Sequence, residues 1–356
     1  MNILLLTGKF GMGHWSAAQA LAAQLEGAGH TVALTDLFHY AMPELAPALY
    51  RGFQFLVSRL GGVYNLHHRR TRDEAGEIPL ARLLERKVGE LAGALRPALI
   101  LSTHPVCSGA AARYKWVAGS TLPLITCMTD VTDHSEWIHP GTDCYLVPSP
   151  DVRKALVDKG VAAGRILVSG VPVKDGFAAA RRQDGPRRLL IMGGGLGLMP
   201  RRDSFYQALN DLEGVRTTIL TGKNQRLYRR LAGRYANLEA VPFTDRVAQY
   251  MAQSHLMLSK PGGVTCFEAI ASRLPMLAWE PFLEQERENA RFLVRHGMAR
   301  VVGKEENACL AAIRQTIYDR PLLAGMEQAM DRLAAGLCRD AVCAAVQIWS
   351  EEAVCA

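Results

Sequence analysis

The residues best suited to chemistry in this chain follow apolar segments, at turns that contain glycine. The clearest example is KPGGVTCFE (260–268), where a predicted buried strand runs through a Pro-Gly-Gly turn into a helix. Small residues let backbone amides approach a ligand, and a helix start offers unpaired N–H groups and the positive end of the helix dipole. A purely structural turn would have the same sequence. The functional interpretation is a phosphate-binding turn that involves Lys260, Gly262, Gly263 and Thr265.

Glu268 lies about one turn inside this predicted helix. There its carboxylate can accept hydrogen bonds from both hydroxyls of a ribose while a diphosphate lies at the helix start. The alternative is an exposed glutamate that the helix dipole favours. The next loop, PFLEQERENARF (281–292), also follows a strand, and its polar residues suit either sugar hydroxyls or a solvated helix start. The sugar-contacting candidates in it are Gln285, Glu286 and Asn289.

Two further strand-to-helix turns are expected at the same edge of the second half, GGGLGLMP (193–200) and TGKNQ (221–225). Phe243 ends another predicted strand and is either a lining residue of the base pocket or a core residue. Together these turns predict a site for a sugar nucleotide. The turns add four candidates: Gly194, Gly195, Gly222 and Lys223.

The first half opens with its own glycine-rich turn, TGKFGMGHWSAAQAL (7–21). Its glycines resemble a dinucleotide fingerprint, but His14 breaks the required spacing, so we exclude a nicotinamide cofactor. The positive end of a helix dipole disfavours an imidazolium, and a neutral ring can accept a proton near pH 7. His14 is therefore a candidate general base, or alternatively a histidine that only binds a phosphate or sugar oxygen. Gly11 and Gly13 are expected to contact the nucleotide-sugar donor.

The loop MTDVTDHSEWIHPGTDCYLVPSPDV (128–152) follows another buried strand and combines carboxylates, imidazoles and an indole. It has no metal-ligand spacing, and helix starts and cations can stabilise a leaving diphosphate, so we expect no metal and no other cofactor. We expect an acceptor-side role, with Asp130 as a second catalytic candidate and His134 and Trp137 as acceptor-binding residues. A hydrogen-bonded structural loop is the alternative.

A basic segment lies between these two motifs. From Arg51 to Arg72 the chain has five arginines and no acid, interleaved with aromatic residues such as Phe53, Phe55 and Tyr64. This composition suits the interface of an anionic membrane, or alternatively a core-facing helix followed by a solvated basic loop. No recognised nucleic-acid-binding module accompanies the charge, so nucleic acid is not an expected partner.

Strands that alternate with helices must position these turns, and the apolar segments show that rhythm. The expected strands are 2–7, 31–36, 98–103, 123–129, 188–195, 216–223, 238–243, 255–263 and 274–281. This order predicts parallel sheets covered by helices, and the chain length suits two domains. We expect an α/β protein of two doubly wound domains facing across a cleft. The expected boundaries are 1–172, a linker at 173–186, 187–335, and a C-terminal helix at 336–356 that packs back on the first domain.

Bulk composition is that of an ordinary globular protein, with 49% hydrophobic and 21% charged residues. The formal net charge of +7 permits acidic partners such as nucleotide phosphates or an anionic bilayer. The 8 cysteines show no metal-binding pattern and are expected to be reduced. Since we see no leader and no apolar run of membrane-spanning length, we expect a cytoplasmic protein, peripheral on the cytosolic face of a membrane.

Over nearly its whole length the sequence resembles the monogalactosyldiacylglycerol synthase and processive diacylglycerol glucosyltransferase family. The ordered motifs behind the resemblance are TGKFGMGHWSAAQAL, TDVTDHSEWIHP with DCYLVPSPDV, VSGVPV, and KPGGVTCFEA followed by EPFLEQERENARF. The resemblance implies a glycosyltransferase-B fold whose C-terminal domain binds a UDP-sugar, UDP-glucose or UDP-galactose, and whose N-terminal domain binds the lipid. It also implies metal-independent, inverting transfer to the free hydroxyl of diacylglycerol. The peptidoglycan N-acetylglucosaminyltransferase shares this fold but has different signatures in its first loop and its TD loop.

Within the family pattern, His14 matches the functional histidine, Glu268 the ribose-binding glutamate and Gln285 the sugar-contacting glutamine. Trp137 matches the tryptophan near the lipid-binding region. Glu284 stands where the family pattern has glycine and adds a negative charge close to the donor sugar. Two rival functions are a glycosyltransferase acting on a polyprenyl-linked or soluble acceptor, and a non-catalytic UDP-sugar sensor.

Overall fold

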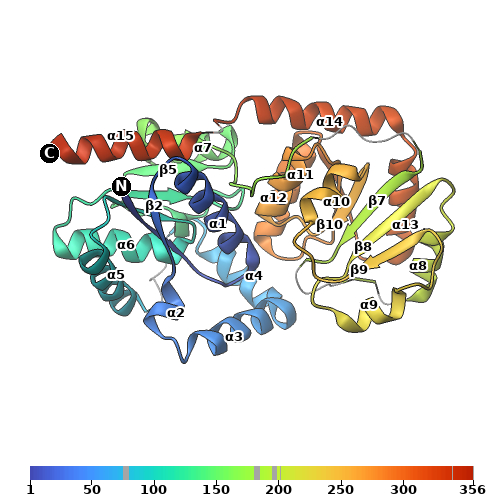
Figure 1. The fold of residues 1–356 in the computed structure, drawn as a ribbon, viewed down its shortest axis with the longest axis horizontal. Helices are drawn as coiled ribbons and strands as arrows, with labels where there is room; N and C mark the ends of the chain where they lie inside the picture. The colour runs from blue at the N-terminus through green and yellow to red at the C-terminus, as the bar shows by residue number, and fades with distance from the viewer. Residues whose placement is uncertain (75–79, 180–184, 195–198, 201, 339, 356) are drawn as a thin grey trace. The chain divides into compact units, whose positions relative to one another are not determined.

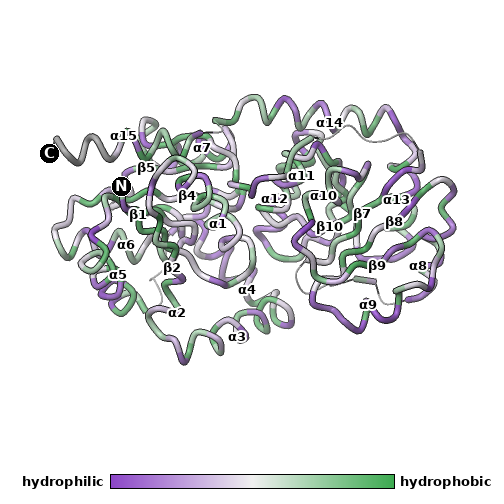
Figure 2. Tube along the Cα trace, viewed as in Figure 1, coloured by the Kyte–Doolittle hydropathy of each residue, from purple (hydrophilic) through white to green (hydrophobic). Residues whose placement is uncertain are grey.

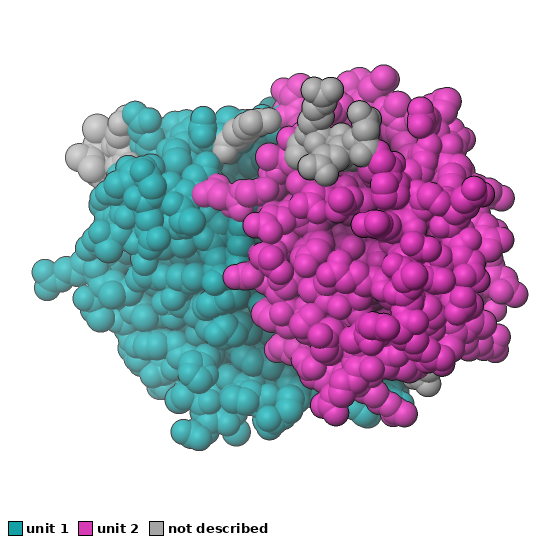
Figure 3. All heavy atoms as spheres, turned by 45° about the vertical axis from the view of Figure 1, so that its right-hand side comes forward, with its two compact units in different colours: residues 1–174, 283–285, 337–356 teal, residues 175–282, 286–336 magenta. Residues whose placement is uncertain are grey.

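The computed structural model describes residues 1–74, 80–179, 185–194, 199–200, 202–338 and 340–355 (Figure 1). These residues form two compact units, each built around one parallel sheet (Figure 3). Unit 1 comprises residues 1–174, 283–285 and 337–356, and unit 2 comprises residues 175–282 and 286–336. The predicted α/β class, with two doubly wound domains, is confirmed. The first crossing between the units, at 174–175, lies inside the segment expected to be a linker.

Unit 1 has a sheet whose described strands follow the order β2-β1-β3-β4-β5-β6. The strands are β1 (Asn2–Thr7), β2 (Thr31–Asp36), β3 (Leu99–Ser102), β4 (Leu124–Cys127), β5 (Cys144–Val147) and β6 (Ile166–Val168). The helices are α1 (Met12–Gly27), α2 (Leu37–Ala41), α3 (Ala46–Arg59), α4 (Gly61–Arg70), α5 (Ala81–Leu95), α6 (Pro105–Ala118), α7 (Pro150–Asp158) and α15 (Ala341–Cys355). Two 3-10 turns, η1 (Ser135–Trp137) and η2 (Ala163–Arg165), complete it.

The core of unit 1 follows from the alternation of side chains along its strands. On β1, Ile3 and Leu5 pack on one face of the sheet with residues of α1 and α15. Leu4 and Leu6 pack on the other face with residues of α2, α5 and α6. A strand buried on both faces is the arrangement expected for a parallel sheet covered by helices. The continuous apolar run NILLLT is therefore what β1 requires.

Unit 2 has a second parallel sheet, and its described strands follow the order β12-β11-β10-β7-β8-β9. The strands are β7 (Arg187–Met192), β8 (Val215–Leu220), β9 (Leu238–Val241), β10 (Leu256–Ser259), β11 (Met276–Trp279) and β12 (Ala299–Val302). The helices are α8 (Asp203–Asn210), α9 (Gln225–Leu231), α10 (Val247–Gln253), α11 (Gly263–Ala271), α12 (Glu284–Arg295), α13 (Glu306–Ile317) and α14 (Arg320–Ala335). The first two residues of α12 are counted with unit 1.

Hydrophobic residues concentrate along the central strands of each unit, as the green segments at β1 and β7 show (Figure 2). In unit 2, Leu189 and Ile191 of β7 share a buried cluster with Phe205 of α8 and Ile313 of α13. Both sheets reverse their strand order once, between β1 and β3 in unit 1 and between β7 and β10 in unit 2. Ligands of open α/β sheets bind outside the carboxyl ends of strands at such a reversal.

Candidate active site

The reversal point of unit 1 brings together two helix starts. Helix α1 follows β1 and covers one face of the sheet, whereas α6 follows β3 and covers the other. His14 lies in the first turn of α1, and His104 is the residue that precedes α6. The centroids of the two imidazole rings are 4.7 Å apart. Two histidines that are 90 positions apart in sequence therefore meet because β1 and β3 are neighbours.

The hydrogen bonds of His14 fix its tautomer. Its Nδ1 lies 2.9 Å from the carbonyl oxygen of Thr103 and 2.8 Å from Oγ1 of Thr129. A carbonyl oxygen can only accept a hydrogen bond, so Nδ1 carries the proton and donates it. The lone pair of a neutral ring then lies on Nε2. A histidine held in this way by a backbone carbonyl is arranged to accept a proton at its other nitrogen.

The charge state of His14 is set by opposing effects. Burial lowers the pKa of its imidazole below the usual 6.5, whereas the nearby charge of Asp130 and the hydrogen bond to Thr103 raise it. Burial is the largest of these effects, so His14 is neutral at pH 7. Asp130, which lines the same cavity, thus acts on His14 through its negative charge.

Asp130→Asn is expected to shift the pH dependence of activity. A general base must be neutral, so kcat/KM should be constant above the usual pKa of 6.5 and fall only at lower pH. Removing the charge of Asp130 removes an effect that raises the pKa of His14, and the fall should move to still lower pH. The measurement is kcat/KM against pH for the variant and for a control, Asp151→Asn, at an exposed position. The plateau of kcat/KM should fall as well, because the charge of Asp130 favours the protonated ring, and a pH profile identical to that of the wild type would contradict this role of Asp130.

A cavity of about 490 Å³ lies beside these histidines in unit 1. Phe10 packs edge-on against Phe38 and Phe53, with ring centroids 4.5 and 5.3 Å apart. His14, His104 and Asp130 are among the polar residues that line it, so its wall combines apolar surface with groups that can hydrogen-bond a ligand. The apolar lining consists mainly of Phe10, Phe38, Leu49, Phe53, Val57, Val106 and Trp137.

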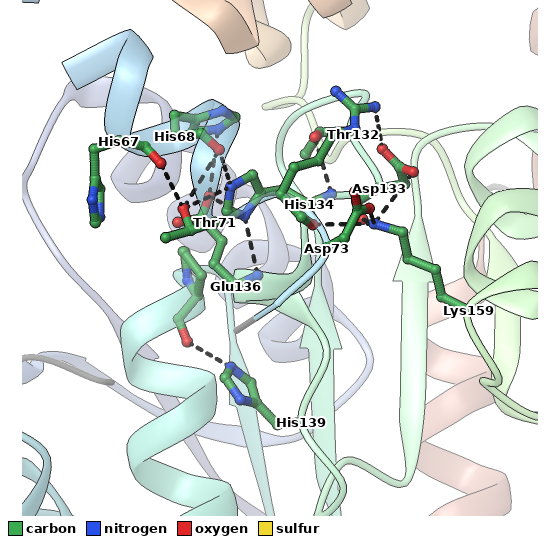
Figure 4. A network of polar contacts seen from close by, with 12 residues as sticks. His67, His68, Thr71, Asp73, Thr132, Asp133, His134, Glu136, His139 and Lys159 are labelled. Carbon is green, nitrogen blue, oxygen red and sulfur yellow. Dashed lines mark hydrogen bonds and ion pairs between the residues drawn. The ribbon is translucent and has the colours of Figure 1, made fainter. Parts of the chain in front are cut away.

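The loop after β4 is held by its own hydrogen bonds (Figure 4). His134 Nε2 donates to the carbonyl oxygen of His68 over 2.8 Å, and the Glu136 N–H donates to His134 Nδ1 over 3.1 Å. Both ring nitrogens of His134 are thus engaged by the chain, so its direct contact with an acceptor stays a prediction.

A metal ion is a second possible ligand of this region, because His68, His134 and Glu136 lie close enough together to share one. His134 could serve as a ligand only by giving up one of these bonds. Trp137, which is 2% exposed, lies at the wall of the cavity.

Lys159, the residue that follows α7, anchors the loop after β4. Its Nζ donates to the carbonyl oxygens of Asp133, over 2.7 Å, and Arg72, over 3.2 Å, and lies 3.4 Å from an Asp133 carboxylate oxygen. Only 20% of the Lys159 side chain is exposed. The lysine therefore ties the loop after β4 to the segment that follows α4.

Lys159→Met is expected to lower the free energy of unfolding by about 1–3 kcal/mol, because two part-buried carbonyl groups and a carboxylate lose a charged donor. The check is the thermal unfolding midpoint of the variant. Lys154→Met is the matched control, since that side chain is 80% exposed and pairs with Asp158 on the same helix. Equal midpoints for the two variants would contradict the anchoring role.

The reversal point of unit 2 lies at the start of α11, directly after β10. Gly262 precedes the helix, and along it the half-buried positions recur every third residue: Gly262, Thr265 and Glu268. Val264, Cys266 and Phe267 between them are buried. These three half-buried residues therefore form one open stripe that begins at the helix N-terminus. All three are residues that the sequence predicted for phosphate or ribose binding, whereas the predicted Gly263 is buried and Lys260 precedes the turn.

The loop before α12 supports this turn. Asn289 is completely buried, and its Nδ2 donates to the carbonyl oxygen of Pro261 over 3.0 Å. Lys260 Nζ lies 3.9 Å from a carboxylate oxygen of Glu286. The amide of Asn289 thus shapes the phosphate-binding turn, and its contact with the sugar stays a prediction. Gln285 belongs to unit 1, where it lines the cavity, and its role in donor binding likewise stays a prediction.

The remaining predicted residues lie as follows. Gly194 and Gly222 have φ angles of +67° and +55°, a conformation that favours glycine, whereas Gly195 lies outside the described residues. Phe243 is 63% exposed, so the interpretation as a core residue is wrong. Gly11 and Lys223 are exposed at turns, and Gly13 is exposed in the first turn of α1.

Sequence reasoning missed Thr103, His104 and Thr129. The segment STHP (102–105) follows β3 in the way that GMGH follows β1, with a histidine at the start of a helix. This repeated pattern of a strand, a short turn and a histidine at a helix start could have identified His104 as a candidate. The hydrogen bonds of Thr103 and Thr129 to His14 could not be inferred, because they join residues 89 and 115 positions apart.

Comparison with known families identifies the class of protein. Residues 14–173 match the family model of monogalactosyldiacylglycerol (MGDG) synthase, and residues 189–329 match the glycosyltransferase family 28 C-terminal domain. The chain is therefore a glycosyltransferase, whose first part is similar to MGDG synthase and whose second part is similar to the family 28 C-terminal domain.

Curated relatives include the processive diacylglycerol beta-glucosyltransferases of Bacillus cereus (strain AH187) and Bacillus anthracis (strain CDC 684 / NRRL 3495). Each is 26% identical over 92% of this chain and 89% of the relative. Among solved structures, MurG of Acinetobacter baumannii is similar with a TM-score of 0.64 and 16% identity over 98% of this chain and 99% of that one. The spinosyn rhamnosyltransferase SpnG has a TM-score of 0.66 and 18% identity over 97% of this chain and 99% of its own. These similarities confirm the glycosyltransferase-B fold.

Proposed function

We propose that this protein transfers a hexose from UDP-glucose or UDP-galactose to the free hydroxyl of 1,2-diacylglycerol, with inversion at the anomeric carbon. The product is a glycosyldiacylglycerol, and the reaction needs no metal. The observation that carries the proposal is the neutral His14, whose Nδ1–H is held by Thr103 at the edge of a largely apolar cavity. A base beside an apolar cavity suits an acceptor that has one reacting hydroxyl and long apolar chains. The named activity of the Bacillus relatives agrees with this acceptor.

In the proposed reaction, His14 Nε2 accepts the proton of the acceptor hydroxyl as its oxygen attacks the anomeric carbon. The new glycosidic bond forms while the bond from that carbon to the diphosphate oxygen breaks, and UDP leaves with the electron pair. A single displacement inverts the configuration, so an α-linked donor gives a β-glycoside. Asp130 stabilises the imidazolium that forms, because its charge favours a protonated His14.

Unit 2 is the proposed donor-binding unit. The diphosphate would lie at the N-terminus of α11, which begins at Gly263, because the first turn of a helix has N–H groups without helical partners and the helix dipole stabilises negative charge there. Glu268, farther along the same open stripe, would accept hydrogen bonds from the ribose hydroxyls. Lys260, close to this turn, would add a positive charge for the leaving UDP.

We also propose that the protein binds the surface of an anionic membrane on its cytosolic face through α3 and α4. Their exposed apolar residues include Phe55, 60% exposed, and Val63, 61% exposed, next to the arginines of the basic segment. Apolar side chains can enter the head-group zone while arginines meet lipid phosphates. None of the helices in the described parts of the chain has the length and apolar character needed to span a bilayer.

Phe55→Ser is expected to weaken binding to anionic vesicles roughly tenfold, because burial of a Phe side chain contributes about 1.5–3 kcal/mol. Co-sedimentation with phosphatidylglycerol vesicles measures the effect. Trp116→Ser on α6 is the matched control, since Trp116 is 79% exposed but lies outside α3 and α4. A larger loss with Trp116→Ser would assign membrane binding to a different surface.

The function is tested by incubating the protein with 1,2-diacylglycerol and a panel of sugar nucleotides, followed by mass spectrometry of the lipids. The expected product is diacylglycerol with one or more added hexoses, in the β configuration by NMR. Products formed only from polyprenyl phosphates or soluble acceptors would replace the proposed acceptor. Donor binding without any product would favour a sensor.

A further inference from the structure

His104 has features that the reaction described above does not use. It is 6% exposed, it precedes α6, and its ring lies among aromatic neighbours at the wall of the cavity. The ring centroids of Phe10 and Phe38 are each 5.5 Å from that of His104, and the ring of His14 is 4.7 Å away. A histidine this deeply buried normally has hydrogen-bond partners for its ring nitrogens.

Within the part of the chain that the structure describes, neither ring nitrogen of His104 has a hydrogen-bond partner, and Nδ1 is fully buried. An unpartnered buried polar group costs free energy, so its retention calls for an explanation. The backbone of His104 is satisfied, because its N–H and carbonyl oxygen bond Ser102 Oγ and the helix that follows. The side chain alone is therefore left for a ligand in the cavity.

The charge state of His104 limits what it can do. Burial, and then the neighbouring His14, hold the pKa of His104 well below the usual 6.5, so the ring stays neutral while His14 takes the proton. A neutral imidazole has one N–H and one lone pair. Among main-chain groups, a buried N–H without a partner is rarer than a buried acceptor without one, and by the same reasoning we assign the lone pair to the enclosed Nδ1. The N–H of His104 is then on Nε2, the nitrogen available to a ligand.

We propose that His104 is a specificity-determining residue, which donates a hydrogen bond from Nε2 to an ester carbonyl oxygen of the acceptor lipid. This inference rests on the proposed transfer to diacylglycerol. Apart from the reacting hydroxyl, the oxygens of diacylglycerol all belong to its two esters, and a carbonyl oxygen is the stronger acceptor. The rings of His14 and His104 are close enough to bind two oxygens that lie a few bonds apart on one glycerol. His104 thereby places the hydroxyl against His14.

The first test compares two acceptors with the wild-type protein. A 1,2-dialkylglycerol keeps the hydroxyl and the apolar chains of diacylglycerol but has no carbonyl oxygen. We expect kcat/KM to be about tenfold lower for the dialkyl lipid, since His104 then remains unpaired. Equal kcat/KM values would overturn the proposal without any need for a variant. Absence of transfer to diacylglycerol itself would refute the proposed function, and this inference with it.

The second test uses His104→Phe and His104→Gln. Phenylalanine fills a similar space without a donor, so its kcat/KM for diacylglycerol should fall about tenfold and its preference for diacyl over dialkyl lipid should vanish. Glutamine has an amide N–H and should retain part of that preference. His39→Phe, at an exposed position outside the cavity, should keep the full preference.

Folding of unit 1, which contains His104, is checked by the thermal unfolding midpoint, and calorimetric binding of UDP, which should be unchanged in each variant, checks unit 2. A preference that persists in His104→Phe would overturn the proposal, as would equal losses for both lipids. If His104→Phe does not fold, the preference of His104→Gln and of the wild-type protein decides in the same way.

Discussion

His14→Ala is expected to reduce kcat for glycosyl transfer by about 10²–10⁴-fold, the usual contribution of a positioned general base. The alanine variant has no group to accept the proton of the acceptor hydroxyl, so the attacking oxygen remains protonated. Initial rates of product formation measure the effect. UDP affinity should be unchanged, because the proposed donor-binding residues of unit 2 are intact.

The control for this experiment is His39→Ala, which removes an exposed histidine outside the cavity. It should transfer sugar at the wild-type rate, since the capping bond from the His39 backbone N–H to Asp36 does not involve the imidazole. Near-normal turnover of His14→Ala would remove the base assignment and leave His14 as a binding residue. Loss of UDP affinity together with turnover would point to a wider structural defect.

Glu268→Ala is expected to weaken UDP binding about tenfold to a hundredfold, because the ribose hydroxyls lose a charged acceptor. Calorimetric titration of UDP gives the dissociation constant directly. The alanine variant should keep the fold of α11, since Glu268 is half-buried on the open stripe while the neighbouring Phe267 and Ala269 supply the buried contacts.

Two companion variants sharpen the interpretation of Glu268. Glu239→Ala removes an exposed carboxylate from β9 and should leave UDP affinity unchanged, which excludes an effect of net charge alone. Glu268→Gln keeps the shape and one carbonyl oxygen, so its UDP affinity should lie between those of the wild type and Glu268→Ala. An unchanged dissociation constant for Glu268→Ala would refute the ribose-binding role.

The sequence predicted the longer strands of the fold well, and the reason is visible in their packing. Strands β1 (Asn2–Thr7) and β2 (Thr31–Asp36) have the predicted bounds, since each apolar segment is delimited by turn-forming residues. Strands β5, β6 and β12 were not predicted. β5 lay within a segment that was interpreted as a loop. β6 has only three residues, and β12 exposes its two middle residues, so neither has the buried apolar run of predicted four-residue strands such as β10.

The candidate site was predictable where a single sequence motif includes both the functional side chain and the turn and helix that position it. His14 and Glu268 lie on helices that begin directly after a glycine turn, so local sequence placed them. Partners that come from elsewhere in the fold were not predictable. Asn289 was expected to contact a sugar, but its amide bonds Pro261, a residue 28 positions away, because α12 and the phosphate-binding turn pack together in unit 2.

The position of α15 in unit 1 has a consequence for how the protein is made. Ala341, Val342, Ala345 and Val346 are part of the same buried cluster as β1 and α1, although all of unit 2 is encoded between them. During translation, one apolar face of the sheet of unit 1 stays incompletely covered until the ribosome has synthesised residues 341–346. Unit 2 can form its own core in the meantime. A fragment that stops at Lys174 would keep that face uncovered and is a poor choice for expression.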